Sequence, residues 1–242
     1  MHKKLESLAN QYFQFKKFRI QQDRCTMKIG TDGVLLGAWV NLEEEKSILD
    51  VGTGTGVIAL MMAQRSNAVI DAVEIDKNAA GQSLENTKKS PWNSRINVFC
   101  TPLQDFNSKT QYDLIISNPP YFSNSLKNLI QEKSNARHDV TLTLNDFLSS
   151  SHRLLKPSGR LALILPFDKK AAFTKKAREY KLNCIRKTNV RPTPQKQAKR
   201  VLLEFSYKKL PLTEDYLTIE NNKRHDYTQE YIDYTKDFYL YL

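Results

Sequence analysis

Short apolar runs alternate along the chain with longer segments in which apolar residues recur every three or four positions. The short runs are typical of buried strands, and the longer segments of helices that cover a sheet. This alternation predicts an α/β fold with a mostly parallel sheet and helices on both faces. The last two predicted strands are joined by a loop alone, so they can form an antiparallel pair that closes a seven-stranded sheet. The predicted strands cover residues 48–51, 68–74, 96–100, 112–117, 160–166, 184–190 and 200–207, and the predicted helices begin near Val57 or cover residues 77–90, 144–155 and 168–180.

The N-terminal part of the chain carries its own pattern. Residues 12–20 alternate aromatic or apolar with polar side chains, which predicts a strand. Its rings and cations can either bind single-stranded nucleic acid or pack on the domain, and the sequence leaves both possibilities open. Gly30 and Gly33 mark a turn, after which a helix is expected to begin near Gly33 with Thr31 or Asp32 as its cap.

The C-terminal residues 211–242 are predicted to form a helical tail, because four of their aromatic residues follow the spacing of one helix face. These residues are Tyr227, Tyr231, Tyr234 and Phe238. We therefore predict a single domain over residues 1–242. It comprises a short N-terminal extension (1–45) on the ligand-binding side, a core (46–210) and this tail (211–242).

Three glycines follow the first predicted strand at every second position. Gly52, Gly54 and Gly56 come after Asp50 and before an apolar helical pattern. Glycine suits this place because the backbone turns sharply and a ligand packs closely against it. A dinucleotide motif fits loosely, from Gly54 with Ala59 as its last member. The form D-x-G-x-G-x-G resembles instead the first motif of the class I methyltransferases, which bind S-adenosylmethionine.

Acidic residues stand at or after the ends of the next two strands. Glu74 ends the second strand and can accept hydrogen bonds from both ribose hydroxyls of an adenosine-containing ligand. Asp105 follows the third strand and can accept a hydrogen bond from the adenine amino group. The alternatives are that Glu74 merely starts the next helix and that Asp105 is a solvated loop residue.

The stretch Asn118-Pro119-Pro120-Tyr121 follows the fourth strand, which a doubly wound sheet places beside the first. The prolines fix the backbone, so the Asn118 side chain and the Pro119 carbonyl can both accept hydrogen bonds from one NH₂ group. Tyr121 can stack on the flat group that carries this amine. Two acceptors localise the delocalised lone pair of such an amine and aim it at a sulfonium methyl. The motif therefore predicts methyl transfer to an amine without a strong base, which leaves His138 as a weak alternative base.

Together these two motifs resemble the amino-methyltransferases that act on adenine, cytosine, guanine or glutamine NH₂ groups. Three further stretches, residues 15–18, 23–39 and 236–240, are similar to the bacterial tRNA(1)(Val) adenine-N(6) methyltransferase family, as is the motif that ends at Phe122. This resemblance implies a Rossmann-like class I fold and S-adenosylmethionine as cofactor. It also implies methylation of the adenine just after the anticodon of a valine tRNA.

The resemblance carries several residues into roles. Asn118, Pro119 and Tyr121 would be catalytic, and Phe122 would bind the substrate. The turn that contains Asp32 would lie over the methionine end of the cofactor. The complete predicted cofactor site is Lys28, Asp32, Asp50, Gly52, Gly54, Gly56, Glu74 and Asp105.

The charge of the chain indicates a polyanionic partner. Its formal net charge is +11 and its pI is near 9.4. A basic surface kept for solubility is the alternative. Residues 169–200 contain twelve Lys or Arg against the single acid Glu179, and prolines at 192 and 194 predict an exposed loop. We expect the tRNA backbone to contact Lys187, Arg191, Lys196, Lys199 and Arg200.

Other classes of protein are disfavoured. The three cysteines are far apart and odd in number, which argues against disulfides and a metal site. No apolar run approaches the eighteen residues of a membrane span, and the N-terminus lacks a signal core. The sequence therefore predicts a cytoplasmic protein, expected to be a monomer, that binds neither metal nor membrane.

Four alternative functions were weighed against this prediction. A methyltransferase acting on rRNA guanine would share the same chemistry. The protein-glutamine enzymes usually carry a helical N-terminal domain, for which the first 45 residues leave no room. A non-catalytic RNA-binding protein would have little reason to retain Glu74 and the Asn-Pro-Pro-Tyr motif. A nicotinamide dehydrogenase would leave that motif unexplained.

Overall fold

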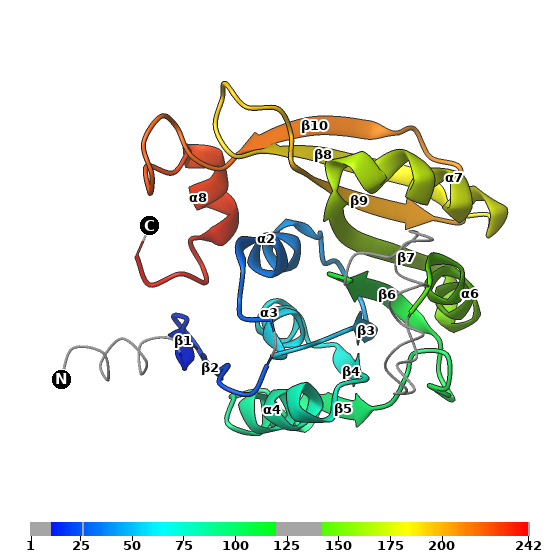
Figure 1. Ribbon diagram of the computed structural model, residues 1–242. Coiled ribbons are helices and arrows are strands. Elements are labelled where there is room, and N and C mark those ends of the chain that lie inside the picture. Colours follow the sequence, from blue (N-terminus) through cyan, green and yellow to red (C-terminus); the bar gives the residue numbers. More distant parts are fainter. Residues whose placement is uncertain (1–10, 26, 120–141, 242) are drawn as a thin grey trace, which may run out of the picture.

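The structure of the protein, a computed structural model, describes residues 11–25, 27–119 and 142–241. Within them the central sheet has eight strands in the order β10-β8-β9-β7-β6-β3-β4-β5 (Figure 1). Neighbouring strands are parallel except at β9, which is antiparallel to both β7 and β8. The strands are β3 (Ser47–Val51), β4 (Val69–Glu74), β5 (Ile96–Cys100), β6 (Tyr112–Ser117), β7 (Leu155–Pro166), β8 (Asn183–Arg191), β9 (Arg200–Ser206) and β10 (Thr213–Thr218).

The predicted fold class is confirmed, including the antiparallel pair of β8 and β9. The expected strand count is one too low, because β10 adds an eighth strand parallel to β8. The prediction that residues 213–218 belong to a helical tail is therefore wrong. The strand is at the sheet edge and half solvated, with only Leu217 and Thr218 buried, so it lacks the apolar run of a central strand.

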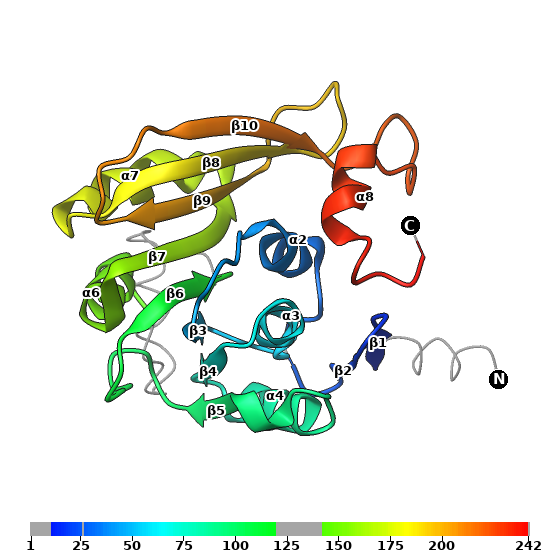
Figure 2. The same cartoon turned by 180° about the vertical axis from the view of Figure 1, so that it is seen from behind.

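Helices cover both faces of the sheet (Figures 1 and 2). One hydrophobic core lies between the sheet and α2, α3 and the C-terminal α8, and the other lies under α6 and α7. α4 packs over β4 and β5. The helices are α2 (Thr31–Trp39), α3 (Val57–Arg65), α4 (Lys77–Lys88), α6 (Leu144–Leu154), α7 (Lys170–Glu179) and α8 (Gln229–Thr235), with short 3-10 turns η1 (Asn93–Arg95) and η3 (Phe167–Lys169).

The N-terminal residues form a hairpin instead of the single strand expected from their alternation. β1 (Tyr12–Gln14) pairs with the antiparallel β2 (Arg19–Gln21). Phe15 and Phe18 are buried and stack on each other, and Phe15 forms a bridge with Tyr239 near the C-terminus. These two rings therefore pack on the domain, which is one of the two possibilities that the sequence leaves open.

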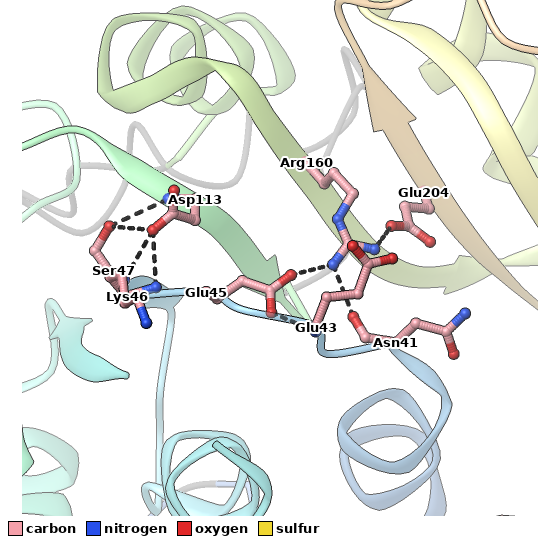
Figure 3. A network of polar contacts seen from close by, with 8 residues as sticks. All are labelled: Asn41, Glu43, Glu45, Lys46, Ser47, Asp113, Arg160 and Glu204. Carbon is pink, nitrogen blue, oxygen red and sulfur yellow. Dashed lines mark hydrogen bonds and ion pairs between the residues drawn. The ribbon is translucent and has the colours of Figure 1, made fainter. Parts of the chain in front are cut away.

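A polar network ties the loop before β3 to neighbouring strands at the amino edge of the sheet (Figure 3). Arg160 on β7 forms ion pairs with Glu45 and Glu204 and donates to the Asn41 carbonyl oxygen. Burial lowers the pKa of Arg160, but the two carboxylates outweigh it and the net direction is upward. Removing one partner of such a buried set is strongly destabilising, because it leaves an uncompensated charge. The network therefore fixes the position at which β3 enters the sheet.

Candidate active site

A cavity of about 330 Å³ lies at the carboxyl ends of β3, β4, β5 and β6. In a doubly wound sheet, this crevice is where ligands bind, at the point where the strand order reverses. Here β3 pairs with β4 on one side and with β6 on the other, so the cavity stands at that point. It is lined by Cys25, Met27, Val51, Gly52, Gly54, Val73, Glu74, Ile75, Asp76, Ala79, Thr101, Pro102, Leu103, Gln104, Asn118 and Leu142.

The glycine turn forms one wall of the cavity. Gly52, Gly54 and Gly56 all have positive φ, between 54° and 85°, a region that favours glycine. A Cβ built on Gly52 or Gly54 would meet no atom within 4 Å, whereas one on Gly56 would lie 2.7 Å from Ser83 Oγ of α4. The first two glycines therefore keep the ligand side clear, and Gly56 lets α4 approach instead of lining the cavity.

Asp50 lies beneath this turn and does not line the cavity. Its Oδ2 accepts hydrogen bonds from Thr53 Oγ1 at 2.6 Å and from the Ala59 backbone N–H at 3.1 Å. Its Oδ1 is buried and has no hydrogen-bond partner among the described residues. Complete burial raises the pKa of Asp50 to about 7, against the lowering effect of those two bonds. The carboxyl group therefore joins the turn to the start of α3.

The raised pKa of Asp50 predicts a pH-dependent stability. The folded state binds its proton more tightly than the unfolded state does, so the stabilising contribution is complete below about pH 4 and is lost as pH rises through about 7. Three pKa units correspond to a loss on the order of 4 kcal/mol in the free energy of unfolding. Asp50→Asn retains the acceptor oxygen and should remove this dependence. Urea unfolding of both proteins from pH 4 to 8 measures it, and parallel curves would contradict the assignment.

Glu74 ends β4 at the cavity wall. Its Oε2 accepts a hydrogen bond from the Gly54 N–H at 2.9 Å, and its Oε1 accepts one from the Asp76 N–H at 3.0 Å. Asp76 in turn caps α4 by accepting from the Ala79 N–H at 2.8 Å. The strand-to-helix turn thus holds the carboxylate directly beside the glycine turn, where a ligand's hydroxyl groups can reach it.

Asn118 enters the cavity from the end of β6. The preceding Ser117 donates its hydroxyl to the Val51 carbonyl oxygen at 2.8 Å, which holds the ends of β6 and β3 together. Behind Asn118 lies α2, where a Cβ built on Gly33 would stand 3.9 Å from Asn118 Nδ2. Pro119 is buried. Tyr121 and Phe122, which were also predicted for the site, lie outside the described residues, as does His138.

Besides Asp50 and Gly56, three more residues predicted for the cofactor do not line the cavity. Asp105 is exposed, and its backbone N–H donates to the Pro102 carbonyl oxygen. Lys28 is also exposed. Asp32 does not cap α2, because the cap residue is Gly30. Its carboxylate instead accepts from Arg200 Nε at 2.7 Å.

Cavity residues that the sequence did not predict follow the strand ends directly. Ile75 and Asp76 come after β4, and Thr101 to Gln104 come after β5. The rule that ligands lie at the carboxyl ends of parallel strands would have found them. Cys25 enters from the N-terminal extension without a comparable signal. Burial, with the nearby carboxylates of Glu74 and Asp76, raises the pKa of its thiol to about 11, so this wall residue is neutral.

The predicted RNA-contact residues divide into two groups. β8 runs in the same direction as β6, so Arg191 at its end and Arg200 at the start of β9 lie at the same sheet edge as Asn118. Lys196 and Lys199 are exposed in the loop between them. Lys187 lies further back on β8 and forms an ion pair with Glu214 at 2.6 Å, so it does not belong to this loop group.

The cavity fits S-adenosylmethionine in its chemistry. Gly52 and Gly54 leave open space, Val73, Ile75 and Leu103 give apolar walls for an adenine ring, and Glu74 offers a carboxylate for ribose hydroxyls. No group of three or more potential metal ligands occurs in the part of the chain that the structure describes. That part also contains no helix long and apolar enough to span a membrane.

Comparisons with known proteins agree with this geometry. A predicted O-methyltransferase from Agrobacterium tumefaciens superimposes with a TM-score of 0.68 at 20% identity, over 86% of this chain and 96% of that chain. A putative RNA methyltransferase from Pyrococcus horikoshii gives 0.52 at 19% identity, over 72% and 80%. Residues 27–174 match the family model of the methyltransferase small domain. Fold and site together define a Rossmann-like, S-adenosylmethionine-dependent methyltransferase.

Two relatives from bacteria identify the family more narrowly. A protein from Parabacteroides distasonis is 48% identical over 236 residues, and one from Trichodesmium erythraeum is 47% identical over 238 residues. Each alignment covers 96% of this chain and 99% of the relative, and both relatives are named tRNA1(Val) (adenine(37)-N6)-methyltransferase. The chain belongs to this family. The family predicted from the sequence is confirmed, and the dehydrogenase alternative is contradicted.

Proposed function

We propose that this protein transfers a methyl group from S-adenosylmethionine to the exocyclic N6 amine of adenine 37, beside the anticodon of a valine tRNA. The observation that carries the proposal is the position of Asn118 in the wall of the same cavity as Gly54 and Glu74. An amine held by Asn118 would therefore face a cofactor held by the other two residues. The names and near-complete coverage of the relatives support tRNA as the substrate.

The cofactor would be held by residues at three strand ends. Glu74 would accept hydrogen bonds from the ribose hydroxyls, while the clear face of Gly52 and Gly54 would let the cofactor approach the backbone. Leu103 and Ile75 would enclose the adenine ring. When bound, S-adenosylmethionine supplies an electrophilic methyl group on a sulfonium. Asp50 would act indirectly, by holding the turn that carries Gly52 and Gly54 in place.

Asn118 would orient the target amine. Its side-chain oxygen and the Pro119 carbonyl would accept the two N–H hydrogens, which localises the nitrogen lone pair and directs it toward the methyl group. Ser117 and Gly33 would keep Asn118 in position from either side. The methylated amine carries a positive charge and loses its proton after transfer, so no strong base is needed. Tyr121 is proposed to stack on the adenine ring.

The RNA would approach from the carboxyl edge of the sheet. A base in a folded loop must be splayed out into the pocket, which requires phosphate contacts around it. Lys196 and Lys199 are exposed at this edge, with Arg191 and Arg200 at the two ends of their loop. The enzyme is proposed to act as a monomer. A tRNA substrate would place the reaction in the cytoplasm.

Neutralising the two loop lysines should weaken tRNA binding without affecting the cofactor. For Lys196→Gln/Lys199→Gln we expect the slope of log affinity against log salt to become shallower by about 1.5, since each phosphate contact contributes about 0.7 to 0.9. The matched control is Lys88→Gln/Lys89→Gln on α4, which removes the same charge from exposed positions elsewhere. Equal slopes for the two double variants would remove the loop from the interface.

Total tRNA from cells that lack this protein tests the proposed function. It is incubated with the purified enzyme and S-adenosylmethionine labelled in the methyl group, and then digested to nucleosides. Label in N6-methyladenosine is the expected result. Label in methylguanosine would keep the mechanism and change the target base. No label in tRNA, with the cofactor still bound, would contradict the proposal and point to rRNA or protein glutamine as the substrate.

A further inference from the structure

A basic hollow of about 500 Å³ lies between α7, the first half of β8 and the loop that leads into β10. Figure 1 shows how these three elements are arranged. Five cations line the hollow, and its described lining contains no Asp or Glu. One of these cations, Lys187, forms an ion pair with Glu214 at 2.6 Å. The cations are Lys170, Lys175, Arg178, Lys187 and Lys209.

The sequence of α7 explains why the helix presents these charges outward. Phe173 and Ala177 are buried one turn apart and anchor the helix in the core. Lys170 and Arg178 therefore face the hollow from the exposed side, two turns apart. On β8, successive side chains point to opposite faces, so Arg186 stacks over Trp39 on the α2 side while Lys187 lines the hollow.

A second hollow of about 330 Å³ lies on the other side of α7, against the start of α6. Lys175 lines both hollows, and Lys176 lines the second, where it pairs with Glu179 at 2.6 Å. Thr143 also lines the second hollow, and its neighbour Leu142 lines the cofactor cavity. The second hollow thus lies between the candidate active site and the basic hollow along the chain of lining residues.

We propose that the basic hollow binds phosphates of the tRNA backbone outside the anticodon loop. This inference rests on the proposed function. From Cys184 in the hollow to Arg191 at the carboxyl edge, β8 spans about 23 Å. Lys170, just after β7, lies nearer the carboxyl edge, whereas Arg178 and Lys209 lie toward the opposite end of β8. An RNA whose target base is in the cofactor cavity must therefore extend well beyond it to reach these two cations.

The arrangement favours a polyanion over a single small anion. The cations are distributed along a helix, a strand and a loop instead of converging on one point. Lys175, Arg178 and Lys209 are exposed, so phosphates can reach them directly, whereas a phosphate at Lys187 would have to displace its ion pair with Glu214. Backbone phosphates spaced along a strand match such a distribution, and the binding energy would come from released counterions.

The test replaces the three exposed cations together, as Lys175→Gln/Arg178→Gln/Lys209→Gln. Glutamine is a good helix former, so α7 should persist. We expect KM for tRNA to rise roughly tenfold and the slope of log affinity against log salt to become shallower by about 2 to 3. The kcat at saturating tRNA and the affinity for S-adenosylmethionine should equal those of the wild type. If the three substitutions disturbed the catalytic centre instead, kcat would fall.

The matched control is Lys88→Gln/Lys89→Gln/Lys109→Gln, which removes three charges from exposed positions that line neither hollow. A salt slope and KM identical to those of this control would overturn the inference. Direct tRNA binding is measured alongside methylation. If the wild type bound tRNA without methylating it, the proposed function would be contradicted. The slopes of log affinity against log salt would still test whether the hollow contacts tRNA. If the wild type did not bind tRNA at all, both would fail.

Discussion

Replacing Asn118 with alanine should reduce turnover about a hundredfold to a thousandfold while cofactor affinity stays within about threefold of the wild type. The size of the effect is that of removing one preorganised polar contact from a developing charge in an enzyme site. Ser117 joins the end of β6 to β3, and α2 lies behind Asn118, so the backbone that carries this residue is held in place before substrate arrives. Alanine leaves the cavity walls intact but removes an acceptor from the target amine.

Single-turnover methylation of tRNA and calorimetric titration of S-adenosylmethionine measure the two quantities separately. The matched control is Asn97→Ala, which changes the same residue type on β5 outside the cavity and should leave both unchanged. A variant at 118 that lost cofactor binding together with activity would show that Asn118 belongs to the cofactor site. Unchanged turnover would remove it from the mechanism.

Replacing Glu74 with alanine should weaken S-adenosylmethionine binding about a hundredfold. Two hydrogen bonds from ribose hydroxyls to a carboxylate contribute about 1.5 kcal/mol each at the lower end, and about 1.4 kcal/mol corresponds to tenfold. The same carboxylate also accepts from the Gly54 and Asp76 N–H groups, so its loss should loosen the glycine turn. Glu74→Gln keeps one acceptor oxygen and should show a smaller loss.

Asp105→Ala provides the contrast, because this acid is exposed and outside the cavity lining. We expect its cofactor affinity to stay within about threefold of the wild type. Calorimetric titration gives the three dissociation constants, and thermal unfolding shows whether each variant is folded. A large loss at Asp105 with none at Glu74 would reverse the two roles and favour the original assignment of Asp105 to the adenine.

The parts of the fold that the sequence predicted best are the strands buried on both faces. β3 and β6 read as apolar runs because helices cover them from either side, and each is followed by a motif that a ligand site needs. β10 was not predicted, because an edge strand needs no apolar run. In this strand Tyr216 is 56% exposed, whereas Leu217 is buried. Gly52, Gly54, Glu74 and Asn118 line one cavity because parallel strands bring their carboxyl ends together, and this juxtaposition follows from the predicted strand order.

Two ion pairs that the sequence did not predict depend on contacts that sequence patterns do not encode. Asp32 meets Arg200 across 168 positions, and Lys187 meets Glu214 on the neighbouring strand, so a count of basic residues overstates the charge available to RNA. In the basic hollow, by contrast, the fold brings together charges that are far apart in the sequence. Lys209 joins the α7 cations only because β9 returns antiparallel to β8, which brings its end beside the start of β8.

The most direct test of the central claim uses a valine tRNA transcript and a second transcript in which adenine 37 is replaced by guanine. Each is incubated with the enzyme and methyl-labelled S-adenosylmethionine, cleaved with a nuclease, and its fragments are analysed by mass spectrometry. We predict one added methyl group in the fragment that contains adenine 37, recovered as N6-methyladenosine, and none in the substituted transcript. Equal methylation of both transcripts, or a methyl group on another base, would contradict the proposed function.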